Sequence, residues 1–91
     1  MKFEARKIEN CFADSRTYEY ELPVDGENFL KYIPDWKIRI NEKLRRPTAI
    51  AERQRVIIKF ILKNNRFRVS FPEESWEKEK NKFEMFLEKL E

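Results

Sequence analysis

Alternation of hydrophobic and polar residues is the strongest pattern in this chain. Large apolar side chains occupy every second position over residues 18–22, 36–40 and 56–62. A period of two predicts β-strands that bury one face and expose the other. Pro23 should end the first of these strands, because proline cannot donate to a sheet ladder.

The N-terminal region predicts a further strand over residues 2–12. Its apolar phase changes part-way along, and a change of one residue turns side chains to the other face of a sheet. We therefore expect a β-bulge near Arg6 and Lys7. Residues 13–16 have the composition of a turn, so this strand and 17–22 are predicted to form a hairpin.

Residues 56–71 predict a second hairpin that turns at Asn64 and Asn65. Asparagine tolerates the left-handed backbone conformation that a two-residue type I′ turn requires at both positions. This turn would align three apolar pairs on one face, namely Leu62 with Phe67, Phe60 with Val69, and Ile58 with Phe71. The opposite face would then carry isoleucines, bases and one serine: Ile57, Lys59, Ile61, Lys63, Arg66, Arg68 and Ser70.

Two helices complete the predicted elements. Residues 76–90 place large apolar side chains at helical spacing, after a start in which Pro72 precedes two glutamates. A shorter helix is predicted over 25–33, with Asp25 as its cap and Pro34 as its stop.

The segment 41–55 is the least patterned part of the chain. It is compatible with a short strand over 48–52 between two exposed basic loops, and Pro47 favours an edge position or a loop.

We predict a single α+β domain over residues 1–91. It would be a two-layer sandwich, in which the long C-terminal helix and the short helix cover one face of an antiparallel sheet of about five strands.

Charge is distributed unevenly along the sequence. The whole chain has a net charge of +3, yet residues 37–68 contain eleven Lys and Arg against two Glu, a net charge of +9. Such asymmetry indicates an anionic partner. The alternative is that acidic flanking elements fold against the basic middle and neutralise it.

The residue types that most catalytic sites require are scarce. The chain has no His, Gly26 is its only glycine and Cys11 its only cysteine. This argues against a His-based triad, a phosphate-cradling loop and a disulfide or Cys-cluster metal site. Cys11 has apolar neighbours and is predicted to be a buried, inert thiol. A hydrolase or nuclease would need a carboxylate cluster, and the sequence pattern does not indicate one. We therefore expect a protein that is not an enzyme and needs no metal or cofactor.

Composition also bears on the setting of the protein. Charged residues make up 41% of the chain, against about 25% in typical soluble proteins. This balance is typical of thermophilic proteins. No apolar run approaches the length of a membrane span, and the start lacks a hydrophobic signal region, so we expect a cytoplasmic protein without membrane contact.

The outward-facing bases are the candidate functional residues. The leading hypothesis is binding of DNA or RNA through phosphate contacts by Lys37, Arg39, Arg45, Arg46, Lys59, Lys63, Arg66 and Arg68. Base stacking is not expected, because Phe67 and Phe71 are predicted to lie in the core. The alternative is a protein–protein interaction or homo-oligomeric assembly, in which an acidic protein or a second copy contacts Ile57 and Ile61.

Overall fold

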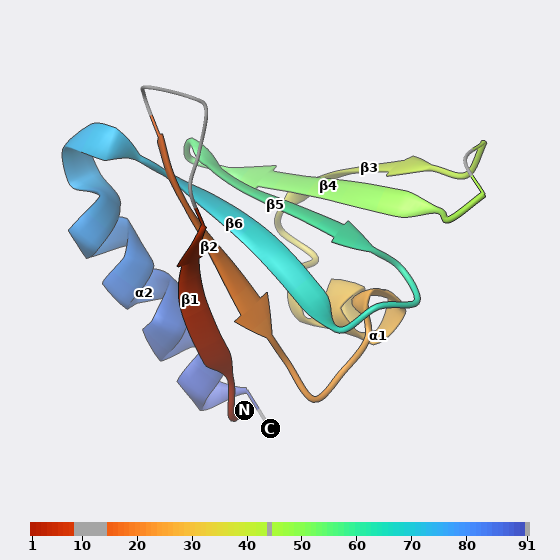
Figure 1. Ribbon diagram of the computed structural model, residues 1–91, viewed down its shortest axis with the longest axis horizontal. Helices are drawn as coiled ribbons and strands as arrows, with labels where there is room; N and C mark the ends of the chain where they lie inside the picture. Colours follow the sequence, from red (N-terminus) through yellow and green to blue (C-terminus); the bar gives the residue numbers. More distant parts are fainter. Residues whose placement is uncertain (9–14, 44, 91) are drawn as a thin grey trace.

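A six-stranded antiparallel sheet forms one layer of the protein, and the helices form the other (Figure 1). The computed structural model describes residues 1–8, 15–43 and 45–90. Along the chain the elements are β1 (Glu4–Ile8), β2 (Ser15–Glu21), α1 (Gly26–Phe29), η1 (Leu30–Tyr32), β3 (Lys37–Asn41), β4 (Thr48–Arg53), β5 (Val56–Ile61), β6 (Arg66–Pro72), η2 (Glu73–Ser75) and α2 (Trp76–Lys89). The strand order is β1-β2-β6-β5-β4-β3. The predicted α+β fold is confirmed, with six strands in place of about five. None of the described helices is long and apolar enough to span a membrane.

The strand that was hardest to predict, β4, lies inside the sheet between β3 and β5. Pro47 precedes it, so the missing N–H interrupts no ladder. Its carbonyl accepts a hydrogen bond from the Leu62 N–H at 3.0 Å. Ala49 and Ala51 point toward the helices and are buried opposite large residues of β5. These small inner residues explain why the segment lacks the alternation of bulky side chains that marks the other strands.

The β5–β6 hairpin is present, but its predicted register is wrong by two residues. Phe60 pairs with Phe67, so the connection is the four-residue loop 62–65. The predicted type I′ turn at Asn64 and Asn65 is also wrong, because neither residue has a positive φ. A shift of two residues keeps every side chain on its face of the sheet. The predicted inward residues are all buried: Ile58, Phe60, Leu62, Phe67, Val69 and Phe71.

The structure has a two-residue turn in the preceding hairpin, between β4 and β5. Gln54 and Arg55 have φ angles of 50° and 73°, and Arg53 pairs with Val56 on either side of them. Positive φ at both central residues is the requirement of a type I′ turn. Neither residue type favours that conformation, so the sequence carries no turn signal here.

Replacing this turn by Asn-Gly is expected to stabilise the protein. The left-handed conformation costs an ordinary residue about 1–2 kcal/mol, so Gln54→Asn/Arg55→Gly should raise the free energy of unfolding by about 1 kcal/mol. The change removes the Arg55–Glu74 ion pair, whose side chains are 65% and 71% exposed and which therefore contributes little. Urea denaturation measures the gain. Arg55→Ala, which breaks the ion pair and keeps the unfavourable φ, is the control and should not stabilise.

The N-terminal strand is regular where the structure describes it. The β1–β2 pairs run from Glu4–Glu21 to Ile8–Thr17 without interruption, so the predicted bulge near Arg6 and Lys7 is wrong. Lys7 lies on the helix side of an edge strand and remains exposed there, so no bulge is needed to keep it in water. Cys11 and positions 13 and 14 of the predicted turn lie outside the described residues, whereas Ser15 and Arg16, also predicted as turn, belong to β2.

Aromatic side chains link the helices to the inner face of the sheet. Phe83 of α2 packs on Tyr20 of β2 and Phe71 of β6, with ring centroids 5.2 Å and 6.1 Å away. Phe29 of α1 packs on Phe67 of β6 at 4.7 Å. Burial of these large rings supplies much of the hydrophobic stabilisation of a domain this small.

The short helix α1 is fastened to the β5–β6 loop through its backbone. The Gly26 and Glu27 N–H groups donate to the carbonyls of Asn64 and Leu62, each at 3.0 Å. Asp25 caps α1 as predicted, because its carboxylate accepts from the Asn28 N–H at 2.9 Å. The predicted helix over 25–33 is therefore present, as the single turn of α1 followed by η1.

A buried tyrosine joins β2 to α2. The Tyr20 hydroxyl donates to the Glu84 carboxylate at 2.8 Å, and Lys80 also donates to that carboxylate. Burial and the hydrogen bond to Glu84 both raise the pKa of Tyr20 well above its ordinary value of 10.0. The hydroxyl therefore stays protonated in the folded protein at pH values where an exposed tyrosine ionises.

The stability of the protein is expected to fall as the pH rises above about 10. There an unfolded tyrosine loses its proton while folded Tyr20 keeps it, so each pH unit lowers the free energy of unfolding by up to about 1.4 kcal/mol. Urea denaturation between pH 7 and 11 tests this with Tyr20→Phe. The variant should be less stable by about 1.5–3 kcal/mol at pH 7, and the difference should shrink at alkaline pH. A constant difference would contradict the raised pKa.

Candidate nucleic-acid interface

The face of the sheet opposite the helices is open to solvent (Figure 1). The strand registers align its side chains in rows that cross the sheet. The central row, from β3 to β1, is Arg39, Ile50, Lys59, Arg68, Glu19 and Arg6. Neighbouring strands lie about 4.8 Å apart, so the distance across the sheet from Arg39 to Arg68 is about 14 Å.

Lys59 and Arg68 are direct cross-strand partners. Like charges at such positions destabilise a sheet. Within the described residues, neither Lys59 nor Arg39 forms an ion pair. We use "basic strip" for Arg39, Lys59, Arg66 and Arg68. Cations gathered on one face in this way are typical of surfaces that bind polyanions.

Acidic residues of β2 neutralise one side of the basic strip in part. Glu19 lies 3.7 Å from Arg68 and 2.9 Å from Arg6, and Glu21 lies 3.9 Å from Arg66. The longer distances exceed ordinary hydrogen-bond lengths, and both strip arginines stay more than half exposed. Flanking acids thus neutralise the basic middle on the β1–β2 side of the open face and, away from that face, at Arg55, which pairs with Glu74. The β3–β6 side of the open face remains basic.

The other predicted bases are distributed around the basic strip. Arg45 and Arg46 are exposed in the β3–β4 loop, and Lys63 is exposed in the β5–β6 loop. Both loops lie at the same end of the sheet, because Leu62 donates to Pro47 between them. Lys37 lies in another row, at the opposite end of β3.

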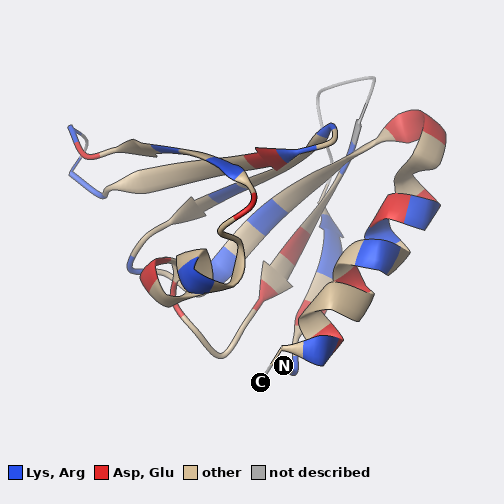
Figure 2. Cartoon of the chain, turned by 180° about the vertical axis from the view of Figure 1, so that it is seen from behind, with Lys and Arg blue, Asp and Glu red and all other residues tan. Residues whose placement is uncertain are grey.

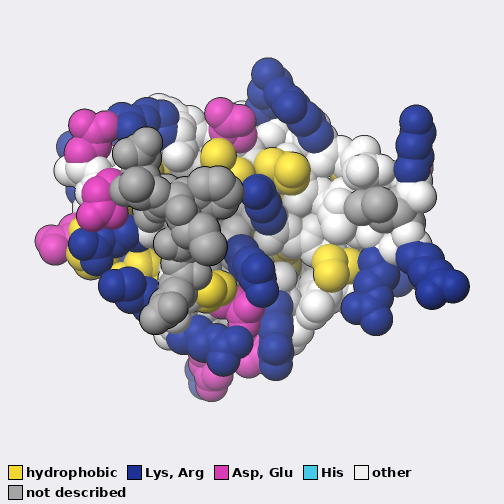
Figure 3. Space-filling view, turned by 45° about the horizontal axis from the view of Figure 1, so that its top comes forward, with side chains coloured by type: hydrophobic (Ala, Val, Ile, Leu, Met, Phe, Trp, Pro, Cys, Tyr) yellow, Lys and Arg dark blue, Asp and Glu magenta, His cyan; other side chains and the backbone are white. Residues whose placement is uncertain are grey.

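Isoleucines surround Lys59 on the open face. Ile57 and Ile61, predicted as contact residues, are half-buried on β5. Ile50 of β4, which is 39% exposed, lies directly opposite Lys59 and was missed. The sequence pattern could have identified Ile50 as an outward-facing residue, because it alternates with Ala49 and Ala51, which point inward. Figure 3 shows Lys and Arg side chains across this face with hydrophobic side chains beside them.

The open face is hollowed over β4, β5 and β6. The hollow has a volume of about 580 Å³, and its lining includes Thr48, Ile50, Lys59, Ile61, Arg66 and Arg68. The helical layer has a different surface, since Lys alternates with Glu along α2 (Figure 2). A concave, predominantly basic surface is therefore a property of the sheet and not of the whole protein.

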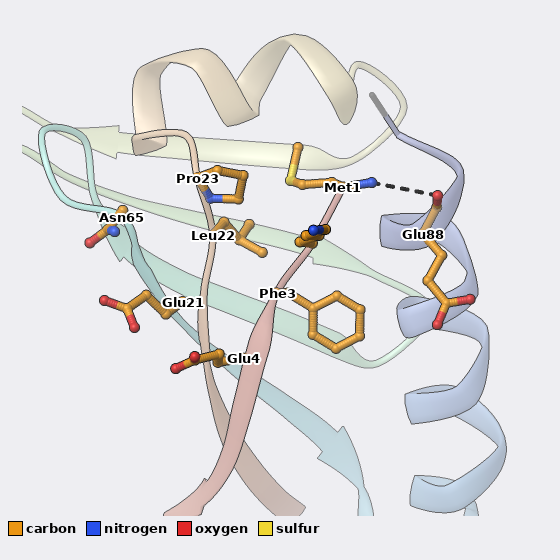
Figure 4. Close-up of a pocket in the computed structure, with 9 residues that line it drawn as sticks. Met1, Phe3, Glu4, Glu21, Leu22, Pro23, Asn65 and Glu88 are labelled. Atoms are coloured by element: carbon orange, nitrogen blue, oxygen red, sulfur yellow. Dashed lines mark hydrogen bonds between the residues drawn. The ribbon is translucent and has the colours of Figure 1, made fainter.

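Two further hollows lie away from the basic strip. One of about 740 Å³ lies beside the start of β1, where the Met1 amine donates to the Glu88 carbonyl (Figure 4). The same amine also donates to the Leu90 carbonyl. The lining of this hollow carries three glutamates together with Lys2 and the Met1 amine, so it lacks the basic excess of the open face. Another, of about 400 Å³, lies between α2 and the β4–β5 turn. In the part of the chain that the structure describes, no group of three or more acids or cysteines could hold a metal ion.

No protein-family model, curated protein or solved structure matches this chain. A proposal for its function therefore depends on the chemistry of the open face.

Proposed function

We propose that the protein is a non-enzymatic nucleic-acid-binding domain that holds the sugar–phosphate backbone on its open sheet face. The observation that carries this proposal is the direct pairing of Lys59 with Arg68 in a row that also contains Arg39. Phosphate oxygens would lie between these cations and relieve a repulsion that the isolated sheet must tolerate. Arg45, Arg46 and Lys63 extend the positive surface past the end of the strands.

Among the described strand residues, none places an aromatic side chain on this face. The described part of the face therefore offers no rings on which nucleic-acid bases could stack. Proteins that hold single strands usually stack bases on aromatic rings. Here the strand aromatics Tyr18, Tyr20, Phe60, Phe67 and Phe71 lie on the helix side or in the core. We therefore expect backbone contacts that do not discriminate base sequence, and a preference for duplexes, which present phosphates at higher density.

Binding should weaken steeply as salt rises and when the basic strip is reversed in charge. Four phosphate contacts give a slope of about −3 to −4 in a plot of log binding constant against log salt concentration. Arg66→Glu/Arg68→Glu should weaken binding of DNA and RNA duplexes at least tenfold, with little dependence on sequence. Electrophoretic shift assays at two salt concentrations, with single-stranded and duplex probes, measure both effects.

The matched control is Lys31→Glu/Lys78→Glu, which makes the same change in net charge on exposed residues of the helical layer. It should keep most of the affinity. Arg66→Gln/Arg68→Gln is a second test variant, because it places no new acid beside Glu19 and Glu21 and so keeps the fold. If the strip variants bind like the wild type, or the control loses as much affinity as they do, the proposal is wrong.

A second candidate function is self-association through the open face. The exposure of Ile50 beside the half-buried Ile57 and Ile61 favours it, since exposed aliphatic groups often mark contact sites. A face-to-face dimer would, however, bring the basic strips of two copies together. Size-exclusion chromatography with light scattering distinguishes the two functions. A dimer in which Lys59 and Arg68 are protected from chemical modification would support self-association.

A further inference from the structure

The strand β3 forms an edge of the sheet whose outer side is unpaired. It is the last strand in the order and pairs only with β4 (Figure 1). Four of its five residues are exposed and the fifth, Ile38, is half-buried. The other edge, β1, is held differently, because Phe3 packs on Tyr20 at 5.6 Å and the Met1 amine binds the end of α2. Outward-facing N–H and C=O groups of an edge strand are a template for a further strand.

The side chains of β3 define what such a strand would have to carry. On the open face β3 presents Lys37, Arg39 and Asn41. Glu52 of β4 lies directly opposite Lys37, but neither Lys37 nor Arg39 forms an ion pair within the described residues, and Arg39 has Ile50 opposite it. On the helix side it presents Ile38 and Ile40, of which Ile40 is 46% exposed. An added strand turns successive residues to opposite faces. Its best complement therefore alternates acidic residues with aliphatic ones.

A second copy of the chain does not meet this requirement through β3. Antiparallel pairing of two β3 strands about Arg39 would place Arg39 opposite Arg39, and Lys37 opposite Asn41. Directly opposed like charges are unfavourable. The edge thus fits a different, acidic partner better than its own copy.

We propose that β3 is a docking edge for an extended peptide segment in which acidic and aliphatic residues alternate, and that this segment adds a seventh strand to the sheet. Main-chain hydrogen bonds supply affinity, and the alternation supplies specificity. The acids lie beside Lys37 and Arg39, and the aliphatic residues cover Ile40. The proposal is independent of nucleic-acid binding, although Arg39 belongs to both surfaces.

The probe is a fluorescent nine-residue peptide of alternating Val and Glu with blocked ends, titrated into the full chain and followed by anisotropy. Saturable binding below about 1 mM is expected. Hydrogen exchange of β3 amides should slow in the complex. The same peptide methylated at every backbone nitrogen keeps its side chains but has no N–H donors, and should bind at least tenfold more weakly.

Matched variants separate this edge from the rest of the open face. Ile40→Ser should weaken peptide binding about tenfold, whereas Ile50→Ser, which truncates a comparably exposed isoleucine on β4, should not. Arg68→Ser should weaken duplex binding and leave peptide binding intact, so the two proposals fail separately. Absence of saturable binding, equal binding of the methylated peptide, or unchanged exchange of β3 amides would each overturn the inference. The bases of β3 would then serve only to keep the edge from aggregating.

Discussion

Phe67→Ala is expected to lower the free energy of unfolding by about 3–5 kcal/mol, the largest effect of any substitution considered for this protein. The Phe67 side chain is fully buried, with ring centroids 4.7 Å from Phe29 and 5.0 Å from Phe60. It also pairs with Tyr20 across the β2–β6 ladder. Truncation removes contacts to α1, β5 and β2 together, and the rigid sheet cannot collapse into the space left behind.

Phe67→Leu is the matched control for this prediction. It keeps an apolar side chain in the same position and should cost clearly less than the alanine variant. Urea denaturation followed by circular dichroism measures both values. A small domain has about 5–15 kcal/mol of stability in total, so the alanine variant should be partly unfolded at elevated temperature. A cost below about 1 kcal/mol would mean that Phe67 is not at the centre of the core.

Gly26→Ala is expected to destabilise the protein by about 1–3 kcal/mol, although alanine is the better helix former by about 1 kcal/mol. A Cβ atom at Gly26 would lie 2.6 Å from Cδ2 of Phe60, 2.8 Å from the Ile61 carbonyl oxygen and 2.9 Å from Cα of Leu62. Two of these atoms are backbone. They cannot turn aside as a side chain could, so α1 would have to move away from the loop to which it is hydrogen-bonded.

The control for Gly26→Ala is Glu27→Ala, at the next position of the same helix. Glu27 is exposed, so its truncation should change the free energy of unfolding by no more than about 0.5 kcal/mol. Thermal and urea denaturation compare the two variants. If Gly26→Ala were as stable as the wild type, α1 would not approach the β5–β6 loop as closely as described.

Faces of strands proved easier to predict than registers and turns. The inward side chains of 56–71 were assigned correctly although the pairing was displaced by two residues, because an even displacement preserves the face. The true type I′ turn at Gln54 and Arg55 has no favourable turn residue, so local composition could not reveal it. Packing of the neighbouring strands maintains a backbone conformation that these residues would not adopt alone.

The sequence predicted which side of the sheet each basic side chain faces, but not which side chains of other strands lie beside it. Alternation placed Lys59, Arg66 and Arg68 on the outward face, and the structure places them there together. The partial neutralisation by Glu19 was not predictable, because the pairing of β2 with β6 joins segments far apart in the chain. The same holds for the edge position of β3, which follows from strand order and not from local pattern.

The strand order also has a consequence for how the chain reaches its native state. Strands β3 to β6 follow one another as a meander with short loops, whereas the Thr17–Ser70 contact between β2 and β6 joins residues 53 positions apart. Closing so long a loop costs more chain entropy than forming a hairpin between neighbouring strands, and it is therefore slower. We expect the meander to assemble first and the β1–β2 hairpin to dock later. Until then Arg66 and Arg68 lack their acidic neighbours Glu21 and Glu19, so the β6 end of the meander would carry a higher local positive charge than it does in the finished protein.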